Sequence, residues 1–171
     1  MQIAKPFVAA APIMLALAGQ PAMAQSVAAP VPDPWNVAAD PQRSLVRISK
    51  AALTGSAQFV GGCSKAIGMG FIGTFSRYGG TGLQTVDGES ERVLFEVSGE
   101  DWKEAFAVQL RYAAAGGSWE IVNPLAPVFL ASFSRGQQLT VVNSQRQRVF
   151  SFDLTGSTAA VRAMRTTCGI P

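Results

Sequence analysis

Residues 57–78 read AQFVGGCSKAIGMGFIGTFSRY, and their pattern decides the fold class of the chain. Between residues 68 and 75, large and small side chains alternate with a period of two, which is typical of a β-strand. The large face comprises Met69, Phe71 and Phe75 together with Gly73, and the small face comprises Gly68, Gly70, Ile72 and Thr74. Glycines inside a strand mark a bulge or the close approach of another backbone. We therefore expect the small face to lie under a helix, and a ligand groove is the alternative.

Four further stretches of the chain carry strand patterns. Residues 44–51 (SLVRISKA) and 92–98 (RVLFEVS) alternate apolar and polar side chains, so each should have one face toward the core. In the second stretch that face comprises Val93, Phe95 and Val97. Residues 138–143 (QLTVVN) and 149–154 (VFSFDL) flank the polar tip SQRQ, an arrangement that predicts a β-hairpin.

Two short helices are expected in the second half of the chain. Pro127 suits the first position of a helix, and Gly136 suits its end. A final helix should begin at residues 156–158 (GST) and run to about Thr167. The apolar face of this final helix comprises Val161, Met164 and Cys168, at the spacing i, i+3, i+7.

The stretch from Ser98 to Tyr112 supports two interpretations. Ser98 could cap a helix in which Trp102, Phe106 and Leu110 repeat every four residues. Phe106, Val108, Leu110 and Tyr112 also alternate, which favours a strand over residues 105–112. We favour the strand, paired across an Ala-Gly turn at 113–117 with residues 119–122.

These patterns together predict an α+β fold. We expect a single domain, residues 35–171, built on an antiparallel twisted β-sheet or a partial β-sandwich of six to eight strands. One or two short helices, including a C-terminal helix, should pack on the sheet.

The N-terminus has the pattern of an export signal. One lysine precedes an apolar run over residues 7–18, and the small residues of Ala22-Met-Ala24 form a cleavage site before Gln25. We expect residues 1–24 to be a cleaved signal peptide and the Pro- and Ala-rich residues 25–34 to be a flexible leader. The mature chain should be periplasmic or secreted, and no later segment is long and apolar enough to span a membrane.

Cys63 and Cys168 are the two cysteines of the chain. In an oxidising compartment an even pair is most simply one disulfide. A Cys63–Cys168 bond would join the C-terminal helix to the first half of the domain.

Composition excludes several kinds of site. The chain has no histidine, so Ser-His-Asp and Cys-His sites are impossible, and two cysteines cannot complete a structural zinc site. The net charge is +3, and the C-terminal arginines are interleaved with apolar residues, which is not the dense patch that nucleic-acid binding requires. The Gly-rich segment 79–82 lacks the Lys-Ser/Thr of a phosphate-binding loop. We therefore assign no catalytic residue, metal site, cofactor or nucleic-acid partner.

Two sets of residues remain candidates for a site. Trp35, Trp102 and Trp119 could line a glycan or peptide groove, or could belong to the core. Glu96 and Asp153 lie on predicted strands and could converge as the carboxylate pair of a hydrolase. Asp153 could instead cap the turn that follows its strand.

The C-terminal part of the chain resembles a group of small exported proteobacterial proteins. The resemblance lies in the strand Phe150–Leu154, the helix start Gly156-Ser-Thr-Ala-Ala160 and the closing Cys168-Gly169, preceded by residues 127–142. It covers about the last 85 residues and is similar to the endings of the invasion-associated locus B family and the type VI secretion-associated periplasmic protein family. The resemblance implies an exported β-rich domain with envelope or host-contact roles and no known catalytic site.

We therefore expect a non-enzymatic exported accessory protein that binds another envelope or secreted component. The alternatives are a small-ligand or glycan binder, including an inhibitor of an envelope-degrading enzyme, and a carboxylate-based hydrolase. The first alternative requires an exposed Trp35 or Trp119, and the second requires two facing carboxylates.

Overall fold

The computed structural model of the chain describes residues 34–64, 71–77 and 80–171. The chain divides into two compact units, Met1–Pro30 and Val31–Pro171, and every described residue belongs to the second. The predicted signal peptide, residues 1–24, lies outside the described residues. So does the predicted leader, residues 25–34, except for Pro34.

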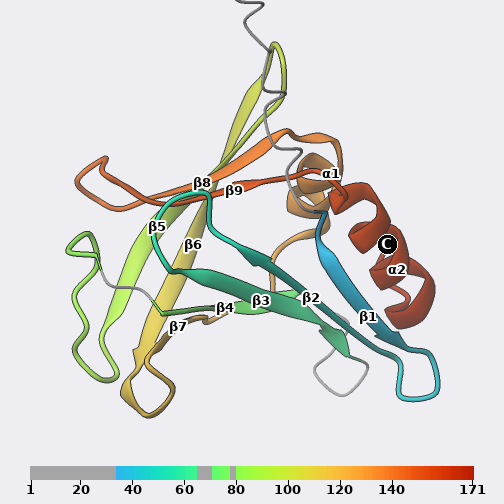
Figure 1. Cartoon of the computed structure of the whole chain (residues 1–171), viewed down its shortest axis with the longest axis horizontal. Helices are drawn as coiled ribbons and strands as arrows, with labels where there is room; N and C mark the ends of the chain where they lie inside the picture. Colours follow the sequence, from blue (N-terminus) through green and yellow to red (C-terminus); the bar gives the residue numbers. More distant parts are fainter. Residues whose placement is uncertain (1–33, 65–70, 78–79) are drawn as a thin grey trace, which may run out of the picture. The chain divides into compact units, whose positions relative to one another are not determined.

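Nine strands form one antiparallel sheet in the part of the chain that the structure describes (Figure 1). They are β1 (Asn36–Asp40), β2 (Leu45–Ala51), β3 (Gln58–Ser64), β4 (Ile72–Ser76), β5 (Ser90–Ser98), β6 (Lys103–Ala113), β7 (Ser118–Ile121), β8 (Gln138–Val142) and β9 (Arg148–Asp153). Their order in the sheet is β1-β2-β3-β4-β7-β6-β5-β8-β9. Two α-helices, α1 (Pro127–Arg135) and α2 (Ser157–Cys168), complete the α+β fold. The antiparallel sheet and the C-terminal helix are as predicted, but the nine strands exceed the expected six to eight, and they form one sheet rather than a sandwich.

The sheet is curled, so that its last strand approaches its first hairpin (Figure 1). The backbone N–H of Leu53, which follows β2, donates a hydrogen bond of 2.8 Å to the carbonyl of Ser151 in β9. At the same end, the indole Nε1–H of Trp35 donates to the carbonyl of Asp153 at 3.1 Å. The sheet is therefore a half-barrel with a concave inner side.

Aromatic rings fill this concave side. Phe75 of β4 stacks on Phe150 of β9 with ring centroids 4.7 Å apart, although four strands lie between β4 and β9 in the sheet. Helix α1 adds Phe129 and Phe133, both about 1% exposed. From β5, Val93, Phe95 and Val97 all point into the core, which confirms the predicted face of that strand.

Residues 98–113 form a hairpin arm, which confirms the strand interpretation. The β5 and β6 strands pair from Ser98↔Lys103 to Ser90↔Arg111, and Gly99 donates a turn hydrogen bond to the carbonyl of Trp102. The helix that the period of four suggested is wrong. Burial in β6 follows the period of two instead, with Val108 buried and its neighbours Ala107 and Gln109 exposed.

Both predicted helices are confirmed. Pro127 occupies the first turn of α1, and Gly136 follows its last residue. In α2, Gly156 and Gly169 at the two ends adopt the left-handed backbone conformation that favours glycine. Cys168 lies on the buried face of α2, and its sulfur is 2.14 Å from that of Cys63 in β3. The predicted disulfide is therefore present and joins α2 to the sheet.

The expected helix over the small face of residues 68–75 is not found. Residues 68–70 lie outside the described residues. In β4, Ile72 and Thr74 face the outer side of the sheet and are half-buried. The helices pack on the opposite, inner side, where Gly61 and Gly73 are register partners. A Cβ atom on either glycine would lie within 2.7 Å of the Phe59 ring. These two glycines therefore allow the Phe59 ring, rather than a helix, to pack closely against the sheet.

Removing the disulfide should lower the free energy of unfolding by about 3–5 kcal/mol, because the bond closes a loop of 105 residues. We expect this loss for Cys63→Ala/Cys168→Ala in urea-induced unfolding. A reducing agent should produce a similar loss in the wild-type chain and none in the double variant. Equal stability with and without the bond would show that it does not constrain the fold.

Gly73→Ala should destabilise the fold by about 1–3 kcal/mol, because its Cβ would lie 2.6 Å from Cζ of Phe59 and 3.1 Å from the carbonyl oxygen of Val60. Gly116→Ala is the matched control. Its Cβ would meet only the flexible Ser118 side chain at 3.0 Å or more, and its effect should stay within about 0.5 kcal/mol. Thermal unfolding of both variants makes the comparison, and equal melting temperatures would contradict it.

Candidate functional site

The three tryptophans do not form an exposed binding surface. Trp35 is 4% exposed and Trp119 is 1% exposed, and both belong to the core. Trp35 packs edge-on against Phe133 with ring centroids 5.0 Å apart. Trp102 is half-buried beneath the Arg135 guanidinium, which lies 4.5 Å from the ring centroid. Trp35 and Trp119 therefore belong to the core, which corrects the binding-surface prediction for these two, whereas Trp102 is partly buried and packs against the core.

The two candidate carboxylates do not face each other. Glu96 forms an ion pair of 2.6 Å with Lys103 and lines a hollow over β5 and β8. Asp153 lies 3.8 Å from Nζ of Lys50 and lines a different hollow. Its carboxylate accepts a hydrogen bond of 2.8 Å from the backbone N–H of Thr155, which confirms its predicted role in the following turn. The pair required for a carboxylate-based hydrolase is thus not assembled from these two residues.

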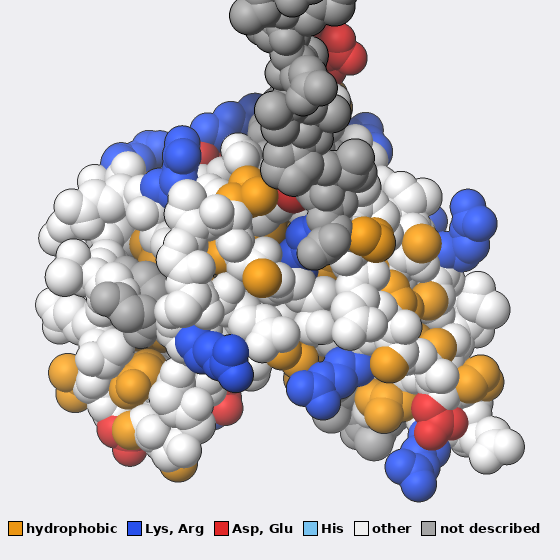
Figure 2. Space-filling view, viewed as in Figure 1, with side chains coloured by type: hydrophobic (Ala, Val, Ile, Leu, Met, Phe, Trp, Pro, Cys, Tyr) orange, Lys and Arg blue, Asp and Glu red, His pale blue; other side chains and the backbone are white. Residues whose placement is uncertain are grey.

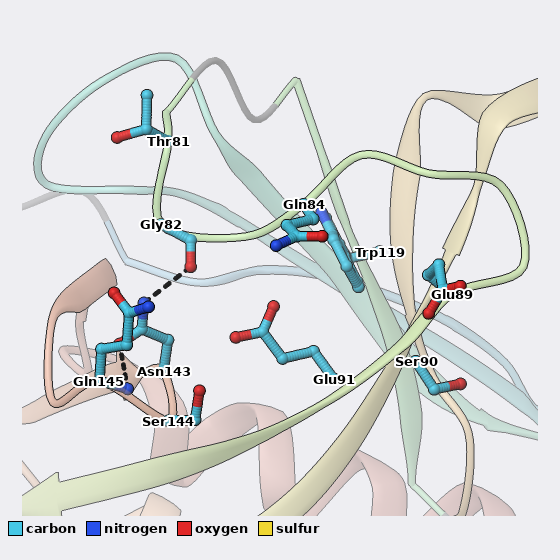
Figure 3. Close-up of a pocket in the computed structure, with 10 residues that line it drawn as sticks. All are labelled: Thr81, Gly82, Gln84, Glu89, Ser90, Glu91, Trp119, Asn143, Ser144 and Gln145. Atoms are coloured by element: carbon cyan, nitrogen blue, oxygen red, sulfur yellow. Dashed lines mark hydrogen bonds between the residues drawn. The ribbon is translucent and has the colours of Figure 1, made fainter.

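A polar hollow of about 270 Å³ lies between the loop before β5 and the β8–β9 hairpin tip (Figure 3). Its lining comprises Thr81, Gly82, Gln84, Glu89, Ser90, Glu91, Trp119, Asn143, Ser144 and Gln145. Asn143 is buried and ties the two segments together, since its side chain donates to the Gly82 carbonyl at 2.8 Å and accepts from the Gln147 backbone at 2.8 Å. These hydrogen bonds of Asn143 fix the loop before β5 and the β8–β9 hairpin tip to each other beside the hollow.

Glu91 points into this hollow, and Glu89 also lines it (Figure 3). Burial raises the pKa of Glu91, and a hydrogen bond from the backbone of Gln84 opposes the rise. The indole Nε1 of Trp119, which lines the same hollow, has no hydrogen-bond partner among the described residues. The hollow thus offers the carboxylates of Glu91 and Glu89 and an N–H donor from Trp119.

A larger hollow, about 780 Å³, follows one edge of β6. We call it the β6 groove. Its residues are Ser90, Arg92, Ala105, Phe106, Ala107, Val108, Gln109, Asn123, Pro124, Leu125, Ala126 and Phe129. One wall is β6, and the other is residues 123–126, which a hydrogen bond of 2.8 Å from Leu125 N–H to the Phe71 carbonyl holds in place.

Half of β6 lacks a partner strand along the groove. On one side, β5 pairs with β6 from Lys103 to Arg111, but on the other, β7 pairs only with Leu110–Ala113. The last backbone contact on that side runs from Val122 N–H to the Gln109 carbonyl at 3.0 Å. Over residues 34–64, 71–77 and 80–171, no strand continues the pairing toward Lys103.

The direction of the free backbone groups follows from the register. Tyr112 exchanges its backbone hydrogen bonds with residues 88 and 89, on the β5 side. Because neighbouring residues of a strand direct their N–H and C=O to opposite sides, even-numbered residues of β6 bond to β5. Odd-numbered residues direct these groups to the other side, as Gln109 does toward Val122. Ala105 and Ala107 therefore present their backbone donors and acceptors to the groove.

The sequence analysis missed this groove. The available signals were the exposed alanines that alternate with Phe106 and Val108, and the two prolines, Pro124 and Pro127, shortly after β7. Proline has no N–H for a sheet ladder, so the chain could not continue beside β6 as a regular strand.

Glu91→Gln should stabilise the fold at neutral pH by less than about 1 kcal/mol, since Glu91 is only partly buried. The pKa of Glu91 in the folded protein lies above its ordinary value of 4.5. Protonated Glu91 therefore favours folding below pH 4.5, and this stabilisation is lost as the pH rises through the pKa of the folded state. The variant and the wild type should therefore converge near pH 3.5. Urea unfolding at the two pH values tests this, with the exposed Glu89→Gln as the control for net charge. A variant less stable than the wild type at pH 7 would contradict the burial cost.

No family model, curated protein or solved structure matches the chain. The resemblance to the invasion-associated locus B and type VI secretion-associated families therefore stays a prediction. Within the described residues, none of the helices combines the length and the apolar character needed to cross a membrane.

Proposed function

We propose that this chain is an exported accessory protein that binds another envelope or secreted polypeptide without transforming it chemically. In this proposal, signal peptidase cleaves near Ala24-Gln25 and the mature chain acts in the periplasm or outside the cell. The observation that carries the proposal is the unpaired edge of β6, which faces a groove of about 780 Å³.

An unpaired strand edge favours a polypeptide over other ligands. Its N–H and C=O groups are spaced to bond with the backbone of another extended chain, and this is a common mode of peptide recognition. The groove volume lies within the range of well-formed ligand sites, about 300–1,000 Å³. Its lining is mostly uncharged, so a bound segment could also bury apolar surface there.

The distribution of carboxylates supports binding rather than catalysis. Glu96 and Asp153 each have a lysine partner and line separate hollows. Among the described residues that line the groove, Arg92 is the one charged side chain, and acid–base chemistry usually needs a group that titrates near neutral pH.

Site-specific photo-crosslinking in the native host tests the proposal. A photoreactive phenylalanine in place of Ala107, whose side chain is exposed beside the groove, should form an adduct with another envelope or secreted polypeptide. The same group in place of Arg162, exposed on α2, should not form that adduct. Matching adducts at both positions, or none at Ala107, would contradict the groove as the binding site. Intact-mass analysis of the exported chain tests the cleavage after Ala24.

A further inference from the structure

We infer that the partner adds an extended segment to β6 as an extra strand, with apolar side chains on one side and an acidic side chain opposite Arg92. This inference rests on the proposed function and specifies the chemistry of the partner segment.

The backbone of β6 sets the conformation of the bound segment. Ala105 and Ala107 are two positions apart in β6, which is about 7 Å along a strand. Each offers one N–H and one C=O to the groove. Alternate residues of an extended segment have the same spacing. A segment of five residues opposite 103–107 would therefore place its first, third and fifth residues in hydrogen-bonding register, whereas Val122 already occupies the place opposite Gln109.

The inner side of the groove favours apolar side chains. Phe106 is half-buried and meets the buried Phe129 edge-on, with ring centroids 5.4 Å apart. Leu125, from the opposite wall, is also half-buried and packs against the core. The second and fourth residues of the segment would point to this side, where they could cover exposed apolar surface.

The outer side of the groove favours a negative charge. Arg92 of β5 is the register partner of Gln109 and lies on the outer face of the sheet. It is exposed and has no ion-pair partner within the described part of the chain. The small Ala107 leaves space for the Arg92 guanidinium to reach across β6, so a carboxylate at the first residue of an antiparallel segment, opposite Ala107, could pair with it.

A second copy of this chain is a poorer occupant. Edge-to-edge pairing of two β6 strands would bring two Arg92 side chains to one sheet with no acidic residue among the groove lining. The chain carries a net charge of +3, and blue basic side chains outnumber red acidic ones on the face in Figure 2. An acidic partner segment is therefore the better complement.

Titration of the mature, disulfide-bonded protein with a designed peptide tests the inference. The probe is Ac-Glu-Val-Thr-Val-Thr-NH₂, whose glutamate would lie opposite Ala107 in an antiparallel strand, and binding is followed by the amide chemical shifts and hydrogen exchange of Ala105 and Ala107. We expect both amides to shift and to exchange more slowly. A peptide with an N-methylated glutamate should bind at least about tenfold more weakly, because it keeps the side chains and loses the N–H donor opposite Ala107. A peptide with lysine in place of glutamate should also bind more weakly.

Two matched pairs of variants separate backbone from charge recognition. Ala107→Pro removes an N–H that bonds to no strand of the sheet and should abolish binding, whereas Ala107→Ser should retain it. Arg92→Glu should reverse the preference between the glutamate and lysine peptides, whereas Arg92→Lys should keep it. Unchanged binding in Ala107→Pro, or of the N-methylated peptide, overturns strand addition. Unchanged preference in Arg92→Glu overturns the acidic requirement.

A different occupant of the groove would give a different result in these experiments. Concentration-dependent dimers that Ala107→Pro dissolves would show that a second copy occupies the groove and would overturn the inference. Peptide binding that appears only after deletion of residues 25–33 would assign the groove to the chain's own leader, with the same consequence. If Ala107 forms its specific adduct in cells but no peptide shifts its amide, strand addition is wrong while the proposed function stands. If the adduct is absent, the proposed function itself fails.

Discussion

The packing of α1 into the concave side of the sheet is the interaction on which the rest of the structure depends. Phe129 meets Phe95 of β5, Phe106 of β6 and Phe71, which directly precedes β4, so one ring joins the β5–β6 pair to a part of the sheet that is not hydrogen-bonded to it. Phe133, one turn later, packs against Trp35 at the start of the domain. A half-barrel without this helix would expose its apolar inner face, because the curled sheet alone has no second layer to cover it.

The same packing creates the open edge of β6. To reach the position where α1 begins, the chain must leave β6 after Ile121, and Leu125 then bonds to Phe71 on the far side of the gap. Because residues 123–126 turn toward α1, β7 does not continue beside Ala105 and Ala107, and the β6 groove lies there instead. Core packing and the proposed binding site are two consequences of one change in chain direction. The backbone hydrogen bonds that β6 lacks beside Ala105 and Ala107 are offset by the burial of the α1 aromatic side chains.

Sequence reasoning succeeded where a residue's environment depends on its immediate neighbours. The β5 face and the α2 stripe are local periodic patterns, and Cys168 lies on that stripe, so both the helix and its disulfide could be predicted. Reasoning failed where the outcome depends on distant segments. Trp119 could have been exposed or buried, and only the pairing of β4, β7 and β6 around it decided for burial. The free edge of β6 is equally non-local, because it reflects where residues 122–126 go rather than the composition of β6 itself.

An open strand edge is an aggregation hazard, and the geometry of the groove explains how this edge avoids it. Exposed basic residues, Arg92 and Lys103, lie near the free part of β6, and charges of this kind discourage non-specific strand pairing. The wall at residues 123–126 imposes a second restriction, because it stands across the groove from the edge. In the proposed function, a strand bound to β6 would have this wall on its other side. This arrangement would favour a single extended segment, such as a chain terminus or a loop, over the edge of an intact sheet.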